Sequence, residues 1–193
     1  MRVETVPIGK RDRARKIIDI FLVTFFIFNF IFICYMFDLE QLVVSGDDHL
    51  YNWPLTDYPI WPPKFIVDLN HWVGTNMDPA LLARETWWQA TIWIDVVLFG
   101  PFYAIATYAF IRGKNWIRMP SIIWASIMLT NVTIIMINEF VLYPTNDMWY
   151  GMVLANLLWI LTPILVYIRM ALYPQTFGGD RYKFKEKTSA VES

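Results

Sequence analysis

The sequence predicts an all-α membrane protein built as a bundle of four transmembrane helices. Four apolar stretches carry this prediction, at residues 17–37, 87–111, 116–143 and 149–172. Each is close to the roughly 20 residues that an α-helix needs to cross the hydrocarbon core of a bilayer. The composition agrees, because 56% of the 193 residues are hydrophobic and 18% are aromatic, which is high for a soluble domain. We expect one membrane domain over residues 17–172, between a basic N-terminus (1–16) and a C-terminal tail (173–193).

The first span is expected to be an uncleaved transmembrane helix. Its apolar run is too long for a secretory signal peptide, and no small-residue cleavage site follows it. The only cysteine, Cys34, lies inside this span, so no intrachain disulfide can form, and we expect a small core residue there. The sequence has no zinc signature or Gly-rich phosphate loop, and its basic residues flank the spans. It therefore predicts no metal, no cofactor and no nucleic-acid partner.

The first loop, residues 38–86, is too long for a simple connection between two helices and too aromatic for a disordered linker. Within residues 64–74, apolar side chains recur at helical spacing: Phe65, Ile66, Leu69, Trp72 and Val73. This pattern predicts a short amphipathic helix that lies along the membrane surface and caps the bundle. Two histidines of this loop, His49 and His71, are expected to be interfacial side chains without a catalytic role.

The basic residues predict the orientation of the bundle. Of the 16 lysines and arginines, all but Lys64 and Arg84 lie before the first span, at the tight second loop (Arg112, Lys114 and Arg118), or at and after the end of the fourth span. The positive-inside rule then places both termini and the second loop in the cytoplasm. The long first loop and the short third loop face the lumen or the exterior.

Asp95 is the most informative residue, because it lies in the middle of the second span. A carboxylate at this depth costs about 2.5–3.5 kcal/mol on insertion scales, so such groups usually face a bundle interior and carry function. Gly100 and Pro101 follow it in the same span, and Pro163 interrupts the fourth. These residues are expected to loosen or kink their helices and to leave room for a cavity.

Helix geometry predicts that other polar residues reach the depth of Asp95. At 1.5 Å per residue, Asp95 lies ~12 Å and Asn156 ~10 Å below the lumenal ends of their helices. Asp38 closes the first helix on the same side, and the third helix contributes Thr130, Asn131, Asn138 and Glu139. We expect one cavity to collect these residues, with walls from Trp93, Trp124, Trp149 and Trp159. It would suit a rigid hydrophobic ligand that bears one hydroxyl or one cationic amine.

Each polar residue also has a purely structural interpretation. The structural alternative for Asp38 and for Glu139 is a carboxylate at the end of a helix, in contact with water. For Asp95 the structural alternative is a hydrogen bond to a neighbouring helix. For Asn131 and Asn156 it is a hydrogen bond that holds two helices together.

Several short motifs resemble one branch of a known superfamily. The run from Ile105 to Phe110, followed by Trp116-Ile117-Arg118 and Pro120, resembles the sigma-2 receptor branch of the EXPERA, or emopamil-binding-protein, superfamily. Phe37-Asp38-Leu39 and Asp78-Pro79 fit the same pattern. The resemblance implies a four-helix protein of the endoplasmic-reticulum membrane that binds sterols and cationic amphiphiles through two acids. It also implies a homodimer.

The same resemblance implies which residues hold the ligand. Asp38 matches the first of the family's two acids, and Asp95 matches the second with a side chain one methylene shorter. Thr130 matches a polar residue of the third helix. Two positions depart from the pattern, since Phe99 stands in place of a Gln and Val73 in place of a Tyr. We therefore expect a more apolar pocket wall.

The fourth span resembles another member of the superfamily, the delta8-delta7 sterol isomerase. The matching run is Asn156-Leu157-Leu158-Trp159 followed by Pro163, whose Asn and Trp line the isomerase substrate site. Isomerisation would use Asp38 and Asp95 as proton-transferring acids and the ring face of Trp159 beside the carbocation. However, Cys34 stands where the isomerase has a His, and Ile92 stands where it has its acid. These departures argue against that chemistry.

Three functions follow, and we favour the first. In the first, the protein binds a sterol or an amphiphilic amine through Asp38, Asp95, Thr130, Asn156 and Trp159, and acts in sterol or lipid homeostasis. In the second, it is a sterol or terpenoid double-bond isomerase. In the third, it is a non-catalytic regulator that grips another membrane protein.

Overall fold

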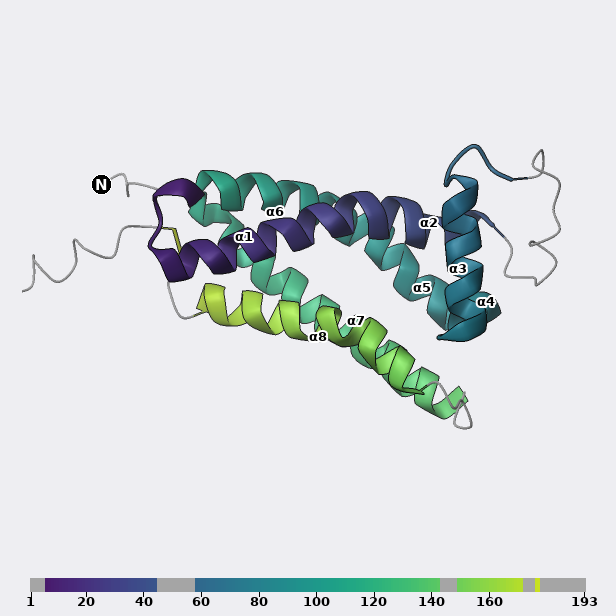
Figure 1. Ribbon diagram of the computed structural model, residues 1–193. Coiled ribbons are helices and arrows are strands. Elements are labelled where there is room, and N and C mark those ends of the chain that lie inside the picture. The colour runs from purple at the N-terminus through teal and green to yellow at the C-terminus, as the bar shows by residue number, and fades with distance from the viewer. Residues whose placement is uncertain (1–5, 45–57, 143–148, 172–175, 178–193) are drawn as a thin grey trace, which may run out of the picture.

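The computed structural model describes residues 6–44, 58–142, 149–171 and 176–177, and all of its regular elements are helical (Figure 1). The first span combines α1 (Arg13–Phe28), the π-helical segment η2 (Asn29–Asp38) and α2 (Leu39–Val43). The second combines α5 (Thr86–Ile94), the π-helical segment η5 (Asp95–Phe99) and α6 (Gly100–Arg112). The third and fourth are α7 (Arg118–Leu142) and α8 (Trp149–Ala171).

Four helices are long and apolar enough to cross a membrane, so the four predicted spans are confirmed. They cover Arg13–Val43, Thr86–Arg112, Asn115–Leu142 and Trp149–Ala171, close to the predicted limits. The exposed face of the bundle is apolar, as in Ile123, Val97 and Leu154. Such a face is expected where lipid, rather than water, surrounds the helices.

The short helices lie at the two ends of the bundle. η1 (Ile8–Lys10) precedes α1, and η6 (Asn115–Ile117) precedes α7. At the opposite end, α3 (Lys64–Asn76) and α4 (Ala80–Ala83) lie across the bundle (Figure 1). α3 confirms the short helix predicted in the first loop. We call these two ends the η1 end and the α3 end.

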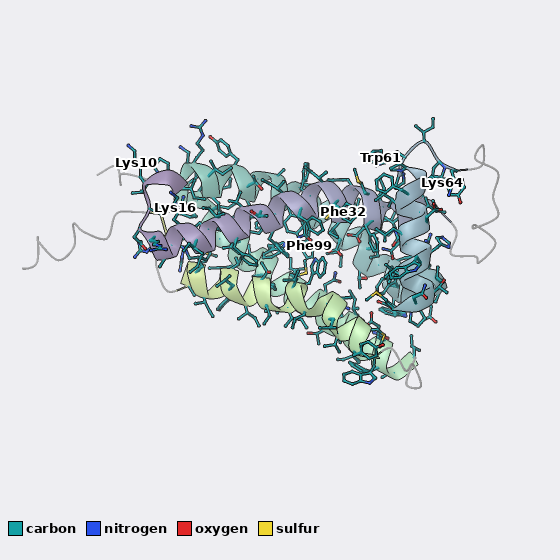
Figure 2. All side chains as sticks on the ribbon, viewed as in Figure 1. Lys10, Lys16, Phe32, Trp61, Lys64 and Phe99 are labelled. Atoms are coloured by element: carbon teal, nitrogen blue, oxygen red, sulfur yellow. The ribbon has the colours of Figure 1, made fainter. Side chains whose placement is uncertain are left out.

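The predicted orientation would place the η1 end on the cytoplasmic side and the α3 end on the lumenal side. Lys10 and Lys16 lie at the η1 end, and Trp61 and Lys64 lie at the α3 end (Figure 2). His49 and most of the C-terminal tail (173–193) lie outside the described residues, and so do parts of the first loop and of the basic N-terminus.

An aromatic core joins α1, α6 and α7. Phe26 and Tyr103 are buried and stack with ring centroids 5.9 Å apart, while the Phe102 and Trp124 rings stack at 5.1 Å. Cys34 belongs to the same core with 1% of its surface exposed, which confirms its predicted packing role. Burial of these large side chains is the main favourable contribution to packing of the bundle interior.

The helices are unevenly spread. α1 packs along α6, and α7 packs along α8. The α7–α8 pair leans away from α1 toward the α3 end, where α3 crosses the bundle (Figure 1). The residues of the candidate site lie in this wider half, and Figure 2 shows the labelled side chains of Phe32 and Phe99 in the middle of the bundle.

A buried ion-pair cluster closes the η1 end. Asp19 is 0% exposed and accepts hydrogen bonds from Arg11 Nη1 at 2.6 Å and from Arg169 Nε and Nη2 at 3.2 and 3.1 Å. Arg169 Nη1 donates to the carbonyl of Thr176, and the guanidinium of Arg11 lies 4.4 Å from the ring centre of Phe177. The cluster thereby ties the first span, the fourth span and the segment that follows the fourth span.

Candidate functional site

The two acids of the predicted site lie on the two π-helical segments. Asp38 is the last residue of η2, and Asp95 is the first residue of η5. These segments pack against each other, and the two carboxyl groups are close enough to interact electrostatically. A π-helical turn inside an α-helix shifts the side chains that follow it, and such turns are frequent at functional sites.

Each of these acids has an oxygen without a partner. Asp38 is 5% exposed and Asp95 is partly exposed. No hydrogen-bond donor among the described residues reaches Asp38 Oδ2 or Asp95 Oδ1, and both atoms are buried. Asp38 is therefore not the water-exposed helix-end carboxylate of the alternative interpretation. An unsatisfied buried acceptor is costly, so the pair is suited to a ligand that brings a donor or a positive charge.

Asp38 and Asp95 line one cavity of about 330 Å³. Ligand pockets usually measure about 300–1,000 Å³, so this cavity can hold a small amphiphile. Most of its wall is apolar, contributed by all four spans and by the α3–α4 region. The apolar side chains that line the cavity include Phe32, Ile33, Phe37, Val73, Met77, Leu81, Ile92, Met128, Val132 and Ile135.

Asn156 and Trp159 line the same cavity from α8, as the sequence predicts. Trp159 Nε1 donates a hydrogen bond to Asn29 Oδ1 at 2.9 Å, which joins the fourth span to the first. Asn156 Nδ2 donates within its own helix, to the carbonyl of Met152 at 2.9 Å. The amide of Asn156 therefore does not bridge two helices through this bond.

Thr130 does not reach the cavity, and its neighbour Asn131 does. Thr130 is exposed on α7, where its hydroxyl donates to the carbonyl of Ser126 at 3.0 Å. Asn131 is 3% exposed and lines the cavity. Its Nδ2 donates to the carbonyl of Thr91 at 3.4 Å, and its Oδ1 is buried without a donor among the described residues. The third helix thus presents Asn131, and not Thr130, to a ligand.

The predicted tryptophan walls are only partly correct. Trp159 lines the cavity, whereas Trp124 lies in the aromatic core. Trp93 and Trp149 are 53% and 55% exposed, so they face outward. The tryptophan that sequence reasoning missed is Trp88, which lines the cavity and donates from Nε1 to Gln41 Oε1 at 2.6 Å.

The two departures from the family pattern have different outcomes. Val73 lines the cavity, so the loss of a tyrosine at this position does make the wall more apolar. Phe99 is 0% exposed and belongs to the aromatic core, beside Tyr103 and Trp124. Its side chain therefore does not form part of the cavity wall.

The α3 end carries buried charges that the sequence did not place. Arg84 Nη2 donates to both carboxylate oxygens of Glu40 at 3.0 and 2.9 Å, and the guanidinium also bonds the carbonyls of Leu81 and Val44. His71 is 1% exposed, with Nε2 3.7 Å from Glu40 Oε1, so it is not the interfacial side chain that was expected. These contacts hold α3 and α4 against the first span.

Glu139 also differs from its expected position. It is 0% exposed, and not in contact with water at the end of its helix. Its carboxyl lies within hydrogen-bonding reach of Asp78, which is 3% exposed and lines the cavity. Within the described ranges, no cluster of three or more His, Cys, Asp or Glu residues is arranged to hold a metal ion.

Comparisons with known proteins agree with this architecture. The family model EXPERA (EXPanded EBP superfamily) matches residues 65–170, which is more than half of the chain. The sigma intracellular receptor 2 of Xenopus tropicalis is 27% identical over 139 residues, covering 65% of this chain and 76% of that protein. The human protein of the same name is 32% identical over 74 residues, covering 38% of this chain and 42% of that protein. No solved structure matches. The chain is a multi-pass membrane protein that belongs to the EXPERA family.

Proposed function

We propose that the protein binds a sterol or a cationic amphiphile in the intramembrane cavity and acts in sterol or lipid homeostasis. One observation carries this proposal: a single apolar cavity contains two interacting acids, Asp38 and Asp95, each with a buried oxygen that lacks a partner. A hydroxyl or an ammonium group would supply the missing hydrogen bond. The apolar wall would cover the rest of the ligand.

In this proposal each polar residue has a distinct role. Asp95 meets the ligand's hydroxyl or cation, because it is partly exposed and lies on the cavity wall. Asp38 interacts with Asp95 and orients it, and two adjacent acids in a low-dielectric site share a proton more readily than both ionise. Trp159 offers an aromatic ring that can cover a cation. Asn131 adds an acceptor on the opposite helix.

The resemblance to sigma-2 receptors supports the cellular part of the proposal. We propose a location in the endoplasmic-reticulum membrane, with both termini cytoplasmic. The distribution of basic residues supports this orientation, because the η1 end carries Lys10, Lys16 and Lys114 beside Arg13 and Arg112. The same resemblance supports a homodimer, whereas a membrane-protein partner belongs to the alternative in which the protein is a non-catalytic regulator.

Sterol isomerisation is the second candidate function. The observation that favours it is the position of Asn156 and Trp159, which line the same cavity as both acids. Against it stands Cys34, which is buried in the core at the position where the isomerase has a His.

Sterol retention tests the proposal and separates it from the isomerase. The purified protein, Asp95→Asn and the control Glu85→Gln would be incubated with a panel of sterols, and the bound lipid identified by mass spectrometry. Glu85 is exposed near the α3 end and does not line the cavity, so its neutralisation removes one charge without touching the site. Retention of unchanged sterol by the wild type and the control, with loss in Asp95→Asn, is the expected result. Conversion of one double-bond isomer into another would establish the enzyme, and the absence of any retained sterol would refute the sterol-binding proposal.

A further inference from the structure

The cavity wall includes Asp78, one member of a second pair of acids nearer the α3 end; the other member, Glu139, lies behind the wall. Asp78 lines the cavity, and its Oδ1 accepts a hydrogen bond from the backbone N–H of Ala80 at 3.0 Å. Its carboxyl also lies within hydrogen-bonding reach of the carboxyl of Glu139, which is 0% exposed. No N–H donor of the described residues reaches either Glu139 oxygen. The pair therefore holds together only through a proton or a positive charge placed between the two carboxyl groups.

The buried guanidinium of Arg84 donates its hydrogen bonds to other groups and not to Asp78 or Glu139. Arg84 directs Nη2 to both oxygens of Glu40, Nε to the carbonyl of Leu81 and Nη1 to the carbonyls of Glu40 and Val44. Burial raises the pKa of Asp78 above its ordinary value, while the Ala80 N–H and the hydrogen bond with Glu139 act in the opposite direction. Asp78 and Glu139 are thus a buried acid pair without a cationic partner in the described part of the chain.

The two acid pairs are well separated along the bundle. The hydrogen bond from Asn131 to the carbonyl of Thr91 sets these two residues at the same level. Asp95 lies four residues from Thr91, ~6 Å toward the η1 end, and Glu139 lies eight residues from Asn131, ~12 Å toward the α3 end. The pairs are therefore ~18 Å apart along the bundle. The unpartnered Oδ1 of Asn131 lies between them on the cavity wall.

A ligand with one polar head can engage only one of these pairs. It would leave the other pair buried and without a positive charge, and buried acids without a positive charge are less favourable than buried acids with one. A ligand with a polar group at each end can engage both pairs and cover the apolar wall with the chain between them. The separation of the two acid pairs therefore selects a ligand by its chemistry as well as by its length.

We propose that the cavity prefers amphiphiles that carry a basic nitrogen at both ends, with one nitrogen on Asp38 and Asp95 and the other on Asp78 and Glu139. This inference deepens the proposed function and rests on it, because the first nitrogen uses the acid pair already assigned to the ligand. The Asp78–Glu139 pair is then a determinant of specificity.

Two amines of equal chain length test the inference. The dissociation constants of dodecylamine and of dodecane-α,ω-diamine would be measured by calorimetry on the full chain in nanodiscs of neutral phospholipid. One added charge-assisted hydrogen bond should make the diamine bind roughly tenfold tighter or more. Because the two amines partition differently into the bilayer, the informative quantity is the ratio of their constants compared between variants. In Glu139→Gln, this ratio should fall close to the ratio measured for the two amines in nanodiscs without protein. In the exposed control Glu85→Gln, the ratio should equal that of the wild type.

A length series keeps the test decisive if Glu139→Gln does not fold. Hexane-α,ω-diamine carries the same two charges and is too short to span the two pairs, so it should show no advantage over hexylamine. An equal preference for mono- and diamines of dodecyl length, with dodecylamine binding still dependent on Asp95, would overturn the inference and leave the proposed function intact. Failure of both amines to bind would overturn the inference and the cationic-amphiphile part of the proposed function, while the sterol part is tested separately by sterol retention.

Discussion

Replacement of Asp19 by Asn should destabilise the protein more than any other single removal of a negative charge at the η1 end. Asp19 accepts three hydrogen bonds from Arg11 and Arg169, whose side chains are only 3% and 5% exposed. Removal of one partner from a buried ion pair costs about 3–5 kcal/mol, because it leaves an uncompensated buried charge. Both guanidiniums keep bonds to backbone carbonyls, of Val6 and of Thr176, so we expect the lower part of this range.

The assay uses a feature of the chain itself. Cys34 is the only cysteine and is 1% exposed, so a thiol-reactive dye reports unfolding of the bundle. At roughly 2–4 °C of melting temperature per kcal/mol for a chain of this size, Asp19→Asn should melt about 6 °C or more below the wild type. Asp12→Asn is the matched control, because Asp12 is exposed and, among the residues that the structure describes, pairs with the partly exposed Arg15. Exposed pairs contribute about 0–1 kcal/mol. Equal shifts for the two variants would refute the reasoning.

Three further predictions concern the rest of the bundle. In Gly100→Ala, the new Cβ would lie 2.7 Å from Tyr35 Oη, so we expect the free energy of unfolding to fall by about 1–3 kcal/mol, measured by thermal unfolding. Adding Tyr35→Ala should reduce this loss, and an unchanged loss would contradict the role of the contact. In Arg84→Lys, the lysine cannot reproduce the two hydrogen bonds to Glu40, so the free energy of unfolding should fall by about 2 kcal/mol or more in the same assay. A melting temperature equal to that of the wild type would contradict the role of this ion pair. Burial raises the pKa of Asp78, so the folded state binds the Asp78 proton more tightly than the unfolded state, and the contribution of Asp78 to the free energy of unfolding falls as the pH rises above about 4. The melting temperature of Asp78→Asn should therefore rise relative to that of the wild type between about pH 4 and pH 8. A difference in melting temperature that stays constant over this range would contradict the assignment.

Much of the fold could be predicted because membrane spans depend on local sequence. Twenty apolar residues in a row have few alternatives to a transmembrane helix. The same reasoning predicted that Asp38 and Asp95 would reach one cavity, since the depth of a residue follows from its distance to the end of its helix. The structure places both acids on the wall of one cavity, with Asn156 and Trp159.

Rotation about a helix axis was harder to predict than depth. Thr130 and Asn131 have nearly the same depth, yet they point about 100° apart, because an α-helix turns by that angle at each residue. Only Asn131 faces the cavity. The hydrophobic pattern of α7 could not decide between them, because lipid makes the outer face of a transmembrane helix as apolar as its inner face.

Contacts between distant segments were also beyond sequence reasoning. The sequence predicts Glu139 near water, but Asp78, from the connection between α3 and α4, lies within hydrogen-bonding reach of its carboxyl. The ion-pair cluster at the η1 end carried a signal that was not used. Asp19 and Arg169 each lie a few residues inside an apolar span, at the same end of the bundle by topology. Opposite charges at equal depth in two spans are expected to pair.

The most direct test of the central claim is the affinity of a long-chain amine for the cavity in the wild type, in Asp95→Asn and in the exposed control Glu85→Gln. If the acid pair holds the ligand's cation, dodecylamine should bind Asp95→Asn at least roughly tenfold more weakly than the wild type, because a charge-assisted hydrogen bond is lost. The control should stay within about fivefold of the wild type, since a single exposed charge contributes less than about 1 kcal/mol. Equal binding by all three proteins would contradict the account, because the paired acids would then have no part in holding the ligand.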